Sequence, residues 1–249
     1  KKKNATSAIE NIKADVFEDR PIYNVTQALQ GTAAGVSVVQ NSGKPGQALN
    51  IKIRGNNSIS SGVDPLYVVD GIQTKDISGI NPDDIVDITV LKDATSAAIY
   101  GISGSSGVVI VTTKRAKANK PQLNFNAYWG VSNKVDNVDV LNLEQYKTLI
   151  SEINPAWLNT INDPMYAGIN TDWVKKVYTT GFDQNYNVNY AFGNENVRAY
   201  TALGYQNIAG IVSPSDFGRT SAKVNLDAKV TNWLKVTSSL NPNHAVEIF

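Results

Sequence analysis

FDQNYNVNYAF, residues 182–192, alternates apolar and polar side chains with a period of two. On a β-strand this pattern gives one face of aromatic and aliphatic residues and an opposite face that carries Asn185, Asn187 and Asn189. Residues 123–131 and 222–230 repeat it. Strands of about 9–11 residues with one apolar and one strongly polar face are typical of a membrane-spanning β-barrel, whose outer side contacts lipid. We therefore expect antiparallel strands of a transmembrane barrel in this part of the chain.

A soluble antiparallel β-sandwich is the alternative, because its strands also have one apolar and one hydrated face. Two features favour the barrel. Aromatic residues that would form girdles stand near the strand ends: Trp129, Phe182, Phe192 and Trp233. Connections alternate between short ones, such as 193–196 and 230–233, and longer ones, of which 133–181 is the longest. Tight turns on one side and long outer loops on the other are expected of an outer-membrane barrel.

The first half of the chain has a different composition and predicts a mixed α/β domain. Only four of the 21 aromatic residues precede residue 121. Apolar residues at helical spacing end at Leu29, and short strands separated by glycine turns follow. We expect a compact domain of roughly 100 residues. The expected division is an N-terminal segment over 1–14, an α/β domain over 15–118 and barrel strands over 119–249, with a long outer loop at 133–181.

The glycine-rich stretch 101–107 would suggest a phosphate-binding loop if its neighbours were in the right order. Such a loop lies between a strand and the N-terminus of a helix. Here a helix-like segment precedes Gly101 and an apolar strand follows Gly107. The glycines therefore predict a helix end and a tight connection.

Composition excludes several classes of function. The net charge is +1, with 23 basic and 22 acidic residues, which gives no basic footprint for nucleic acid. The chain has no cysteine and one histidine, His244, so we expect no catalytic residues, no cofactor and no metal site. Asp83 and Asp84 follow Asn-Pro and are expected in the first turn of a helix, where carboxylates are favoured, although an acidic metal cluster with Asp87 is conceivable.

Two long stretches resemble a known family. Residues 29–72 and 80–117 resemble the plug domain of the SusC/RagA-like TonB-dependent outer-membrane transporters. The residues that carry the likeness are Arg54, Gly55, Asp70, Gly71, Lys92, Asp93, Tyr100, Gly101 and Gly107. The family usually has an arginine and an asparagine after the Tyr-Gly pair, whereas this chain has Ile102, Ser103, Ser105 and Ser106. The final residues, 241–249, also depart from the strand pattern.

The resemblance implies a plug domain followed by the first antiparallel strands of a transmembrane β-barrel. About 22 strands are expected in a plugged transporter, and at roughly 10 residues each they need about 220 residues. About 130 residues follow the plug, which leaves room for roughly five strands. The chain is therefore expected to be a fragment of a longer protein.

The implied activity is TonB-dependent import of an oligosaccharide or peptide across the outer membrane of a Gram-negative bacterium, with the plug in the barrel lumen. Implied partners are TonB, through a box upstream of Lys1, a SusD-like surface lipoprotein, and outer-membrane lipid. Candidate substrate-binding residues are Asn56, Asn57 and Ser58 in a plug loop and Asn185, Asn187 and Asn189 on the lumen face. Their amides suit neutral, hydrogen-bonding cargo. A soluble α/β plus β-sandwich ligand-binding protein is the alternative.

Arg54 and Asp70 each end an apolar strand just before a glycine, and we predict that they form a buried ion pair. Replacing either with alanine would leave one buried charge without its partner, which typically costs about 3–5 kcal/mol. We expect a lower melting temperature for both variants. An unchanged melting curve would contradict the pairing.

Overall fold

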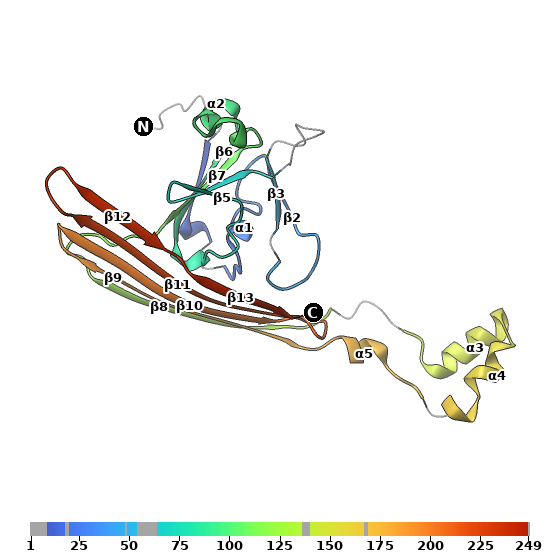
Figure 1. The fold of residues 1–249 in the computed structure, drawn as a ribbon. Coiled ribbons are helices and arrows are strands. Elements are labelled where there is room, and N and C mark those ends of the chain that lie inside the picture. Colours follow the sequence, from blue (N-terminus) through green and yellow to red (C-terminus); the bar gives the residue numbers. More distant parts are fainter. Residues whose placement is uncertain are drawn as a thin grey trace.

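The computed structural model describes residues 9–17, 20–47, 49–53, 64–135, 140–166 and 169–248. An α/β domain lies against one face of a long, curved antiparallel sheet, and a helical arm extends from one end of that sheet (Figure 1). The two regions meet between residues 114 and 121, which join the last strand of the domain to the first strand of the long sheet.

The α/β domain is built on a five-stranded sheet in the order β1-β6-β7-β4-β5. Its strands are β1 (Ile9–Lys13), β4 (Leu66–Val69), β5 (Ile72–Thr74), β6 (Ile85–Leu91) and β7 (Val108–Thr113). Only the β4–β7 pair is parallel. A separate hairpin pairs β2 (Val36–Val39) with β3 (Asn50–Ile53). The edge strand β1 falls within residues 1–14, which the sequence placed before the domain, and it pairs with β6 alone among the described strands.

Short helical segments connect these strands, and each begins where the sequence supplies a cap. The segments are η1 (Ala14–Val16), α1 (Val25–Ala28), η2 (Pro82–Asp84), α2 (Ala94–Ala97) and η3 (Ala98–Gly104). Asn24 forms a capping box with Gln27 at the start of α1. Asn81 accepts the backbone N–H of Asp83 at the start of η2, so the prediction that Asp83 and Asp84 lie in a first helical turn is confirmed.

The core of the domain lies between its sheet, α1 and the β2–β3 hairpin. Fully buried aliphatic side chains fill it: Val25, Leu29, Ile51, Ile85, Ile88, Val90, Val109 and Val111. A smaller cluster under α2 contains Val68, Leu91, Ala97 and Val108. Burying one such side chain is worth about 1.5–3 kcal/mol relative to leaving it exposed, so these clusters stabilise the domain.

The glycine-rich stretch is a connector, as the sequence predicted. Gly101 has φ +64° and interrupts η3, and Gly107 has φ +98° immediately before β7. Asp70 and Gly71, with φ of +50° and +91°, form the tight turn between β4 and β5. Left-handed conformations of this kind favour glycine, and aspartate is one of the few other residues that tolerates them, as at Asp70.

The long sheet contains strands of up to 14 residues. They are β8 (Gln122–Ser132), β9 (Gly181–Gly193), β10 (Val197–Ala209), β11 (Asp216–Lys229), β12 (Lys235–Leu240) and β13 (Asn243–Ile248). All pairings are antiparallel, in the order β12-β11-β10-β9-β8, and β13 also pairs with β11. The expectation that residues 241–249 leave the strand pattern was wrong, because β13 continues the path of β12 after a break at 241–242.

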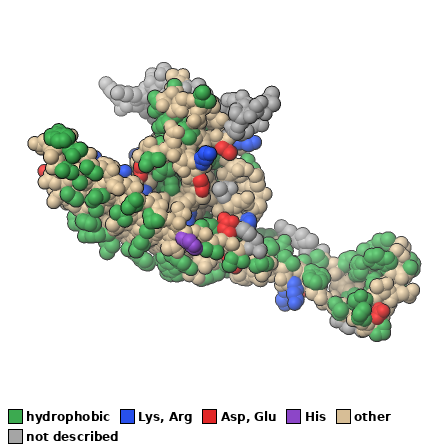
Figure 2. Space-filling view, in the orientation of Figure 1, with side chains coloured by type: hydrophobic (Ala, Val, Ile, Leu, Met, Phe, Trp, Pro, Cys, Tyr) green, Lys and Arg blue, Asp and Glu red, His purple; other side chains and the backbone are tan. Residues whose placement is uncertain are grey.

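The apolar face of this sheet is exposed and its polar face is buried, which is the reverse of a soluble protein. Leu123 and Phe125 are 70% and 66% exposed, whereas Asn187 and Lys223 on the other face are 1% and 2% exposed. Hydrophobic side chains cover the outer side of the sheet (Figure 2). A β-sandwich would bury its apolar face, so this arrangement favours barrel strands over a sandwich. Within the described ranges, no helix has the length and apolar character to cross a membrane.

Aromatic residues lie on the outer face near both ends of the strands, as expected for girdles. Trp129 donates its indole N–H to the hydroxyl of Tyr186 at 2.9 Å, and Tyr205 lies beside Tyr186. Tyr190 and Phe192 stack closer to the other end. The apolar surface between these groups is the surface that the sequence pattern predicted would face lipid.

Connections at the two ends of the sheet differ in length, as predicted. At the short-turn end, residues 194–196 and 230–234 make tight turns. At the long-loop end, the connection from β8 to β9 carries α3 (Leu143–Ile153), α4 (Trp157–Ile161), η4 (Pro164–Tyr166) and α5 (Trp173–Val177). These helices form the arm that extends beyond the sheet in Figure 1.

Gly107 and Gly71 form a matched pair for testing the connector. A Cβ at Gly71 would meet no atom within 4 Å, so Gly71→Ala should cost only the strain of a left-handed residue, about 1–2 kcal/mol. A Cβ at Gly107 would lie 2.7 Å from Ile53 Cδ1. We expect Gly107→Ala to accelerate hydrogen–deuterium exchange in β4 and β7 more than Gly71→Ala does. Equal exchange rates in the two variants would show that the Ile53 side chain moves aside with no loss of stability.

Candidate functional site: the interface between the α/β domain and the long sheet

The polar face of the long sheet meets the α/β domain. Strand registers align Asn185 with Gln206 and Gln206 with Arg219, and align Asn189 with Ala202 and Ala202 with Lys223. These inward residues are mostly polar and mostly buried: Asp183, Asn187, Asn189, Gln206, Arg219, Ser221, Lys223, Asn225 and Asp227. The interface is therefore hydrogen-bonded and ionic over most of its area.

Four charged residues form a network across the interface. Lys223 Nζ lies 3.9 Å from Asp70 Oδ2, and both side chains are under 10% exposed. Arg115, in the segment that joins the two regions, lies 4.0 Å from Asp70 and 3.4 Å from Asp227. Removing one member of a buried pair leaves an uncompensated charge, which typically costs about 3–5 kcal/mol. The turn after β4, the joining segment and β11 are thereby held together.

A second contact joins η2 to the first part of β10. The hydroxyl of Tyr200 donates to Asp84 Oδ1 at 2.8 Å, and both residues are buried. Burial raises the pKa of the Asp84 carboxyl above its ordinary value of 3.8, and the hydrogen bond from Tyr200 opposes that rise. Next to it, Asn185 donates to Asp83 at 3.4 Å. Within the described ranges, no group of three or more histidine or acidic residues is placed to hold a metal ion.

Arg219 donates hydrogen bonds to two backbone carbonyls of the α/β domain. Its guanidinium donates to the carbonyl of Ser78 at 2.7 Å and to that of Tyr23 at 3.2 Å, and the residue is 4% exposed. Sequence reasoning missed this anchor. The sequence did carry a signal, because Arg219 lies on the polar face of an alternating strand. An arginine there must find its partners in the lumen, since the other face of the strand contacts lipid.

Three glycines mark points of close approach between the two regions. A Cβ at Gly204 of β10 would overlap Asn81 and lie 2.7 Å from Ser221 Oγ. A Cβ at Gly79 would lie 2.5 Å from Asn243 Nδ2, and one at Gly46 would overlap the ring of Phe217. The absence of side chains at these positions is what lets the domain lie directly on the sheet.

The predicted lumen-face asparagines lie where the pattern placed them, but two of them are covered. Asn187 and Asn189 are 1% and 2% exposed, and Asn189 donates to Asn187 at 3.2 Å and accepts from Asn124 at 2.9 Å. Asn185 is half-buried and reaches Asp83. The structure therefore brings them to the interface rather than to an open surface.

Five of the other predicted residues lie outside the described residues: Arg54, Gly55, Asn56, Asn57 and Ser58. The pairing of Arg54 with Asp70 therefore stays a prediction. Asp70 accepts the backbone N–H of Thr113 at 2.9 Å, in addition to its contacts with Lys223 and Arg115.

Three further motif residues make contacts inside the α/β domain. Lys92 forms an ion pair with Glu10 of β1. Asp93 caps α2 by accepting the N–H of Ser96 at 2.6 Å, and Tyr100 packs against the cluster under that helix.

Known proteins share both the sequence and the arrangement. Residues 1–108 match the family model of the TonB-dependent receptor plug domain. TonB-dependent receptor P26 of Formosa agariphila is 36% identical over 250 residues, which are 97% of this chain and 25% of the relative. TonB-dependent receptor SusC of Bacteroides thetaiotaomicron is 35% identical over 240 residues, which are 91% of this chain and 23% of SusC.

A solved structure of the RagAB peptide importer in its open-open state superposes with a TM-score of 0.86 at 26% identity, over 98% of this chain and 31% of that chain. This chain is the plug and first barrel strands of a SusC/RagA-like TonB-dependent transporter. The siderophore receptor PirA of Acinetobacter baumannii, at 15% identity and a TM-score of 0.62, shares the fold. The chain spans about a quarter of the length of the relatives named here.

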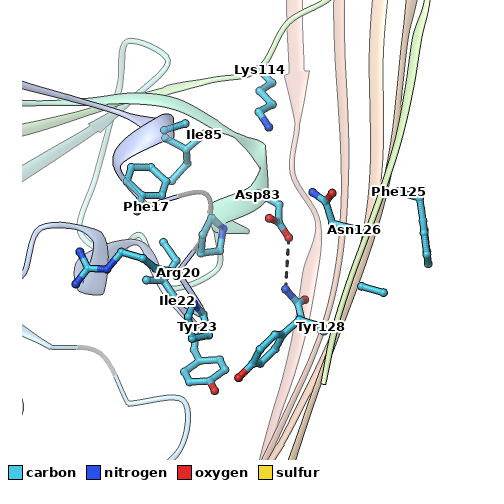
Figure 3. Close-up of a pocket in the computed structure, with 15 residues that line it drawn as sticks. Phe17, Arg20, Ile22, Tyr23, Asp83, Ile85, Lys114, Phe125, Asn126 and Tyr128 are labelled. Carbon is cyan, nitrogen blue, oxygen red and sulfur yellow. Dashed lines mark hydrogen bonds between the residues drawn. The ribbon is translucent and has the colours of Figure 1, made fainter. Parts of the chain in front are cut away.

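The α/β domain is accordingly the plug, and the long sheet is part of the barrel wall. A cavity of about 590 Å³ lies between them, beside β8. In Figure 3, Lys114 lies at one end of the cavity and Tyr23 and Tyr128 lie at the other, whereas Phe125 points away on the far side of β8. Tyr23 donates its hydroxyl to Asp183 Oδ2 at 2.8 Å, and burial raises the pKa of the Tyr23 hydroxyl.

Tyr200→Phe tests the contact of η2 with the wall and has a defined pH dependence. Because the pKa of Asp84 is raised on folding, its contribution to stability is complete below about 3.8 and is lost as the pH rises through the folded pKa. Removing the hydroxyl raises that pKa further. We expect the variant to lose about 1.5–3 kcal/mol of unfolding free energy at pH 7 and less at pH 4.

The measurement is urea unfolding at the two pH values. Tyr205→Phe, on the outer face of the same strand, serves as the control and should change the unfolding free energy little. An equal loss at pH 7 and pH 4 for Tyr200→Phe would show that the carboxylate does not carry the effect.

Proposed function

We propose that the transporter to which this chain belongs imports an oligosaccharide or a peptide across the outer membrane of a Gram-negative bacterium. The observation that supports this most is the inverted polarity of β8–β13 together with a plug held on their inner face by polar contacts. An apolar outer surface requires lipid, and a lumen filled by a separate domain requires that domain to move before cargo can pass.

The proposal includes energy coupling and a surface partner. TonB would act through a segment upstream of Lys1, and a SusD-like surface lipoprotein would cover the outer side of the barrel. RagAB, whose solved structures are described as those of a peptide importer, supports a peptide as cargo. The family resemblance implies an oligosaccharide equally well, so the proposal retains both classes of cargo. We further propose that Asn56, Asn57, Ser58 and Asn185 contact cargo, and that the plug ends at residue 118, with β1 added to it before residue 15.

A soluble α/β plus β-sandwich binding protein is disfavoured by the same surface. Such a protein would have to expose a continuous apolar face that includes Leu123, Phe125, Trp129 and Leu203, each at least 58% exposed. Exposed patches of this extent mark membrane or protein contacts. An enzymatic role is not proposed, because the described interface residues are engaged in structural contacts.

Uptake by cells tests the proposal. The full-length protein, with its lipoprotein partner, would be produced in a strain that lacks its own transporter for the same cargo, and labelled oligosaccharide and peptide mixtures would be offered. We expect accumulation of one class, and loss of accumulation but not of surface binding when TonB is deleted or a protonophore is added. Accumulation that persists without TonB would contradict energy coupling, and purification of the protein without detergent would contradict the membrane location.

A further inference from the structure

Aromatic and basic side chains gather where the helical arm joins the sheet. We call them the arm-base cluster, whose members are Lys134, Trp173, Lys175, Lys176 and Tyr178. Tyr178 forms a β-bridge with Val212, which lies in the loop after β10. Thr180 donates its hydroxyl to Asn133 at 2.8 Å. These contacts connect the base of the arm to the ends of β8 and β10.

The cluster presents three ammonium groups. Lys175 and Lys176 are exposed in the last turn of α5. Lys134, just after β8, lies with its Nζ 5.9 Å from the centroid of the Tyr178 ring. This cation–π contact holds the third ammonium group at the base of the arm, next to the end of α5.

Acidic residues are scarce around these lysines. The segments that form the base of the arm contain three lysines and no aspartate or glutamate; they are residues 133–135, 173–180 and 210–215. Asp172 precedes the second segment, where its carboxylate accepts the backbone N–H of Lys175 at 2.9 Å, and Asp216 follows the third. The charge of the cluster therefore favours an anionic group, and lysine is a common ligand of phosphate.

The cluster lies just beyond the apolar band of the wall, at the long-loop end. The outward apolar residues of β8 end at Val131, which pairs with Phe182 of β9, and both are exposed. Lys134 follows Val131 by three residues, so it is at most about 10 Å farther along the chain. The headgroup layer next to the hydrocarbon core is about 5–7 Å thick, and lysine side chains extend along such a boundary. The ammonium groups can therefore meet lipid phosphates.

The position of the cluster favours a lipid over a protein lid. In Figure 2 the basic side chains over α5 project on the side of the sheet that is away from the plug, next to the hydrophobic outer surface. A lipoprotein that covers the barrel opening would lie over the lumen instead. Trp173 is 70% exposed and Tyr178 is also exposed. Tryptophan and tyrosine favour the level of the headgroups, where one side of the ring is apolar and the other is wet.

We propose that the arm-base cluster binds the phosphate group of a glycolipid in the outer leaflet of the membrane. The acyl chains of this lipid lie on the apolar band that ends at Val131 and Phe182. The bound lipid fixes the base of the arm at the membrane surface. The proposal rests on the outer-membrane location that is part of the function proposed above, and it does not depend on which cargo is imported.

Neutralising two lysines of the cluster tests the site in the purified full-length transporter. The probes are lipid A, a phosphorylated glucosamine disaccharide with acyl chains, and the same lipid after enzymatic removal of phosphate. Each is titrated into detergent micelles, and the bound fraction is measured by native mass spectrometry. We expect Lys175→Gln with Lys176→Gln to raise the half-saturating concentration of lipid A by about tenfold or more. The dephosphorylated lipid should bind to the unmodified protein as weakly as lipid A binds to this variant.

Lys117→Gln with Lys120→Gln is the matched control, because it removes the same charge from two exposed lysines at the short-turn end, before β8. It should change lipid A binding by less than about twofold. The proposal is overturned by normal binding in the α5 variant, by an equal loss in the control, or by equal binding of the two lipids. Competition by millimolar inorganic phosphate would also overturn it, since the site would then take a soluble anion.

Failure of the lipid site and failure of the import function are distinguishable. Lipid binding is measured on purified protein without cargo, whereas import is measured as uptake by cells. If the unmodified protein accumulates cargo and the α5 variant binds lipid A normally, only the lipid site fails. If lipid A binds as expected and no cargo accumulates, the import function fails and the lipid site stands.

Discussion

Every feature of this chain depends on the requirement that strands crossing a membrane be apolar outside and polar inside. Lipid offers no hydrogen bonds, so the wall must pair all its backbone groups and turn its polar side chains inward. Most of the buried residues on the inner face of β9–β11 are therefore asparagine, glutamine, serine and charged residues. A domain that fills the lumen has to match that surface, which is why the plug meets the wall through hydrogen bonds and ion pairs rather than through an extended apolar core.

A polar interface of this kind holds the plug in place and can still separate from the wall. A hydrogen bond contributes about 0.5–1.5 kcal/mol net, because the separated groups regain water. When the plug moves, the hydrogen bonds of Tyr200 with Asp84 and of Arg219 with two plug carbonyls can therefore be replaced by hydrogen bonds to water. Apolar residues also meet at this interface, as where Gly46 approaches the ring of Phe217. The plug keeps its own core meanwhile, since Val25, Ile88 and Val109 are buried within it.

The sequence predicted the parts of the structure that depend on local patterns. Period-two alternation located β8, β9 and β11 and the direction of their faces, and the Asn-Pro-Asp-Asp sequence located η2. It could not predict partners that lie far apart: Asp84 and Tyr200 are separated by 116 residues, and Tyr23 and Asp183 by 160. A strand pattern says which face is polar but not which plug residue each polar side chain meets. For the same reason the pattern placed the asparagines of β9 on the lumen face but did not predict that Asn187 and Asn189 are covered there.

The family usually has an arginine shortly after the Tyr-Gly pair, and the structure shows how its absence here bears on the contacts between the plug and the wall. Ile102 is 93% exposed, and η3 stands on the side of the plug remote from the described wall (Figure 1). Neither Ile102 nor the neighbouring serines can make a charged contact there. Described ion pairs between the plug side and the wall lie elsewhere, at Asp70 with Lys223 and at Arg115 with Asp227. The described contacts that hold the plug on the wall are instead carried by Asp70, by Asp84 and by the backbone carbonyls that Arg219 binds, so the loss of an arginine in η3 leaves this part of the interface unchanged.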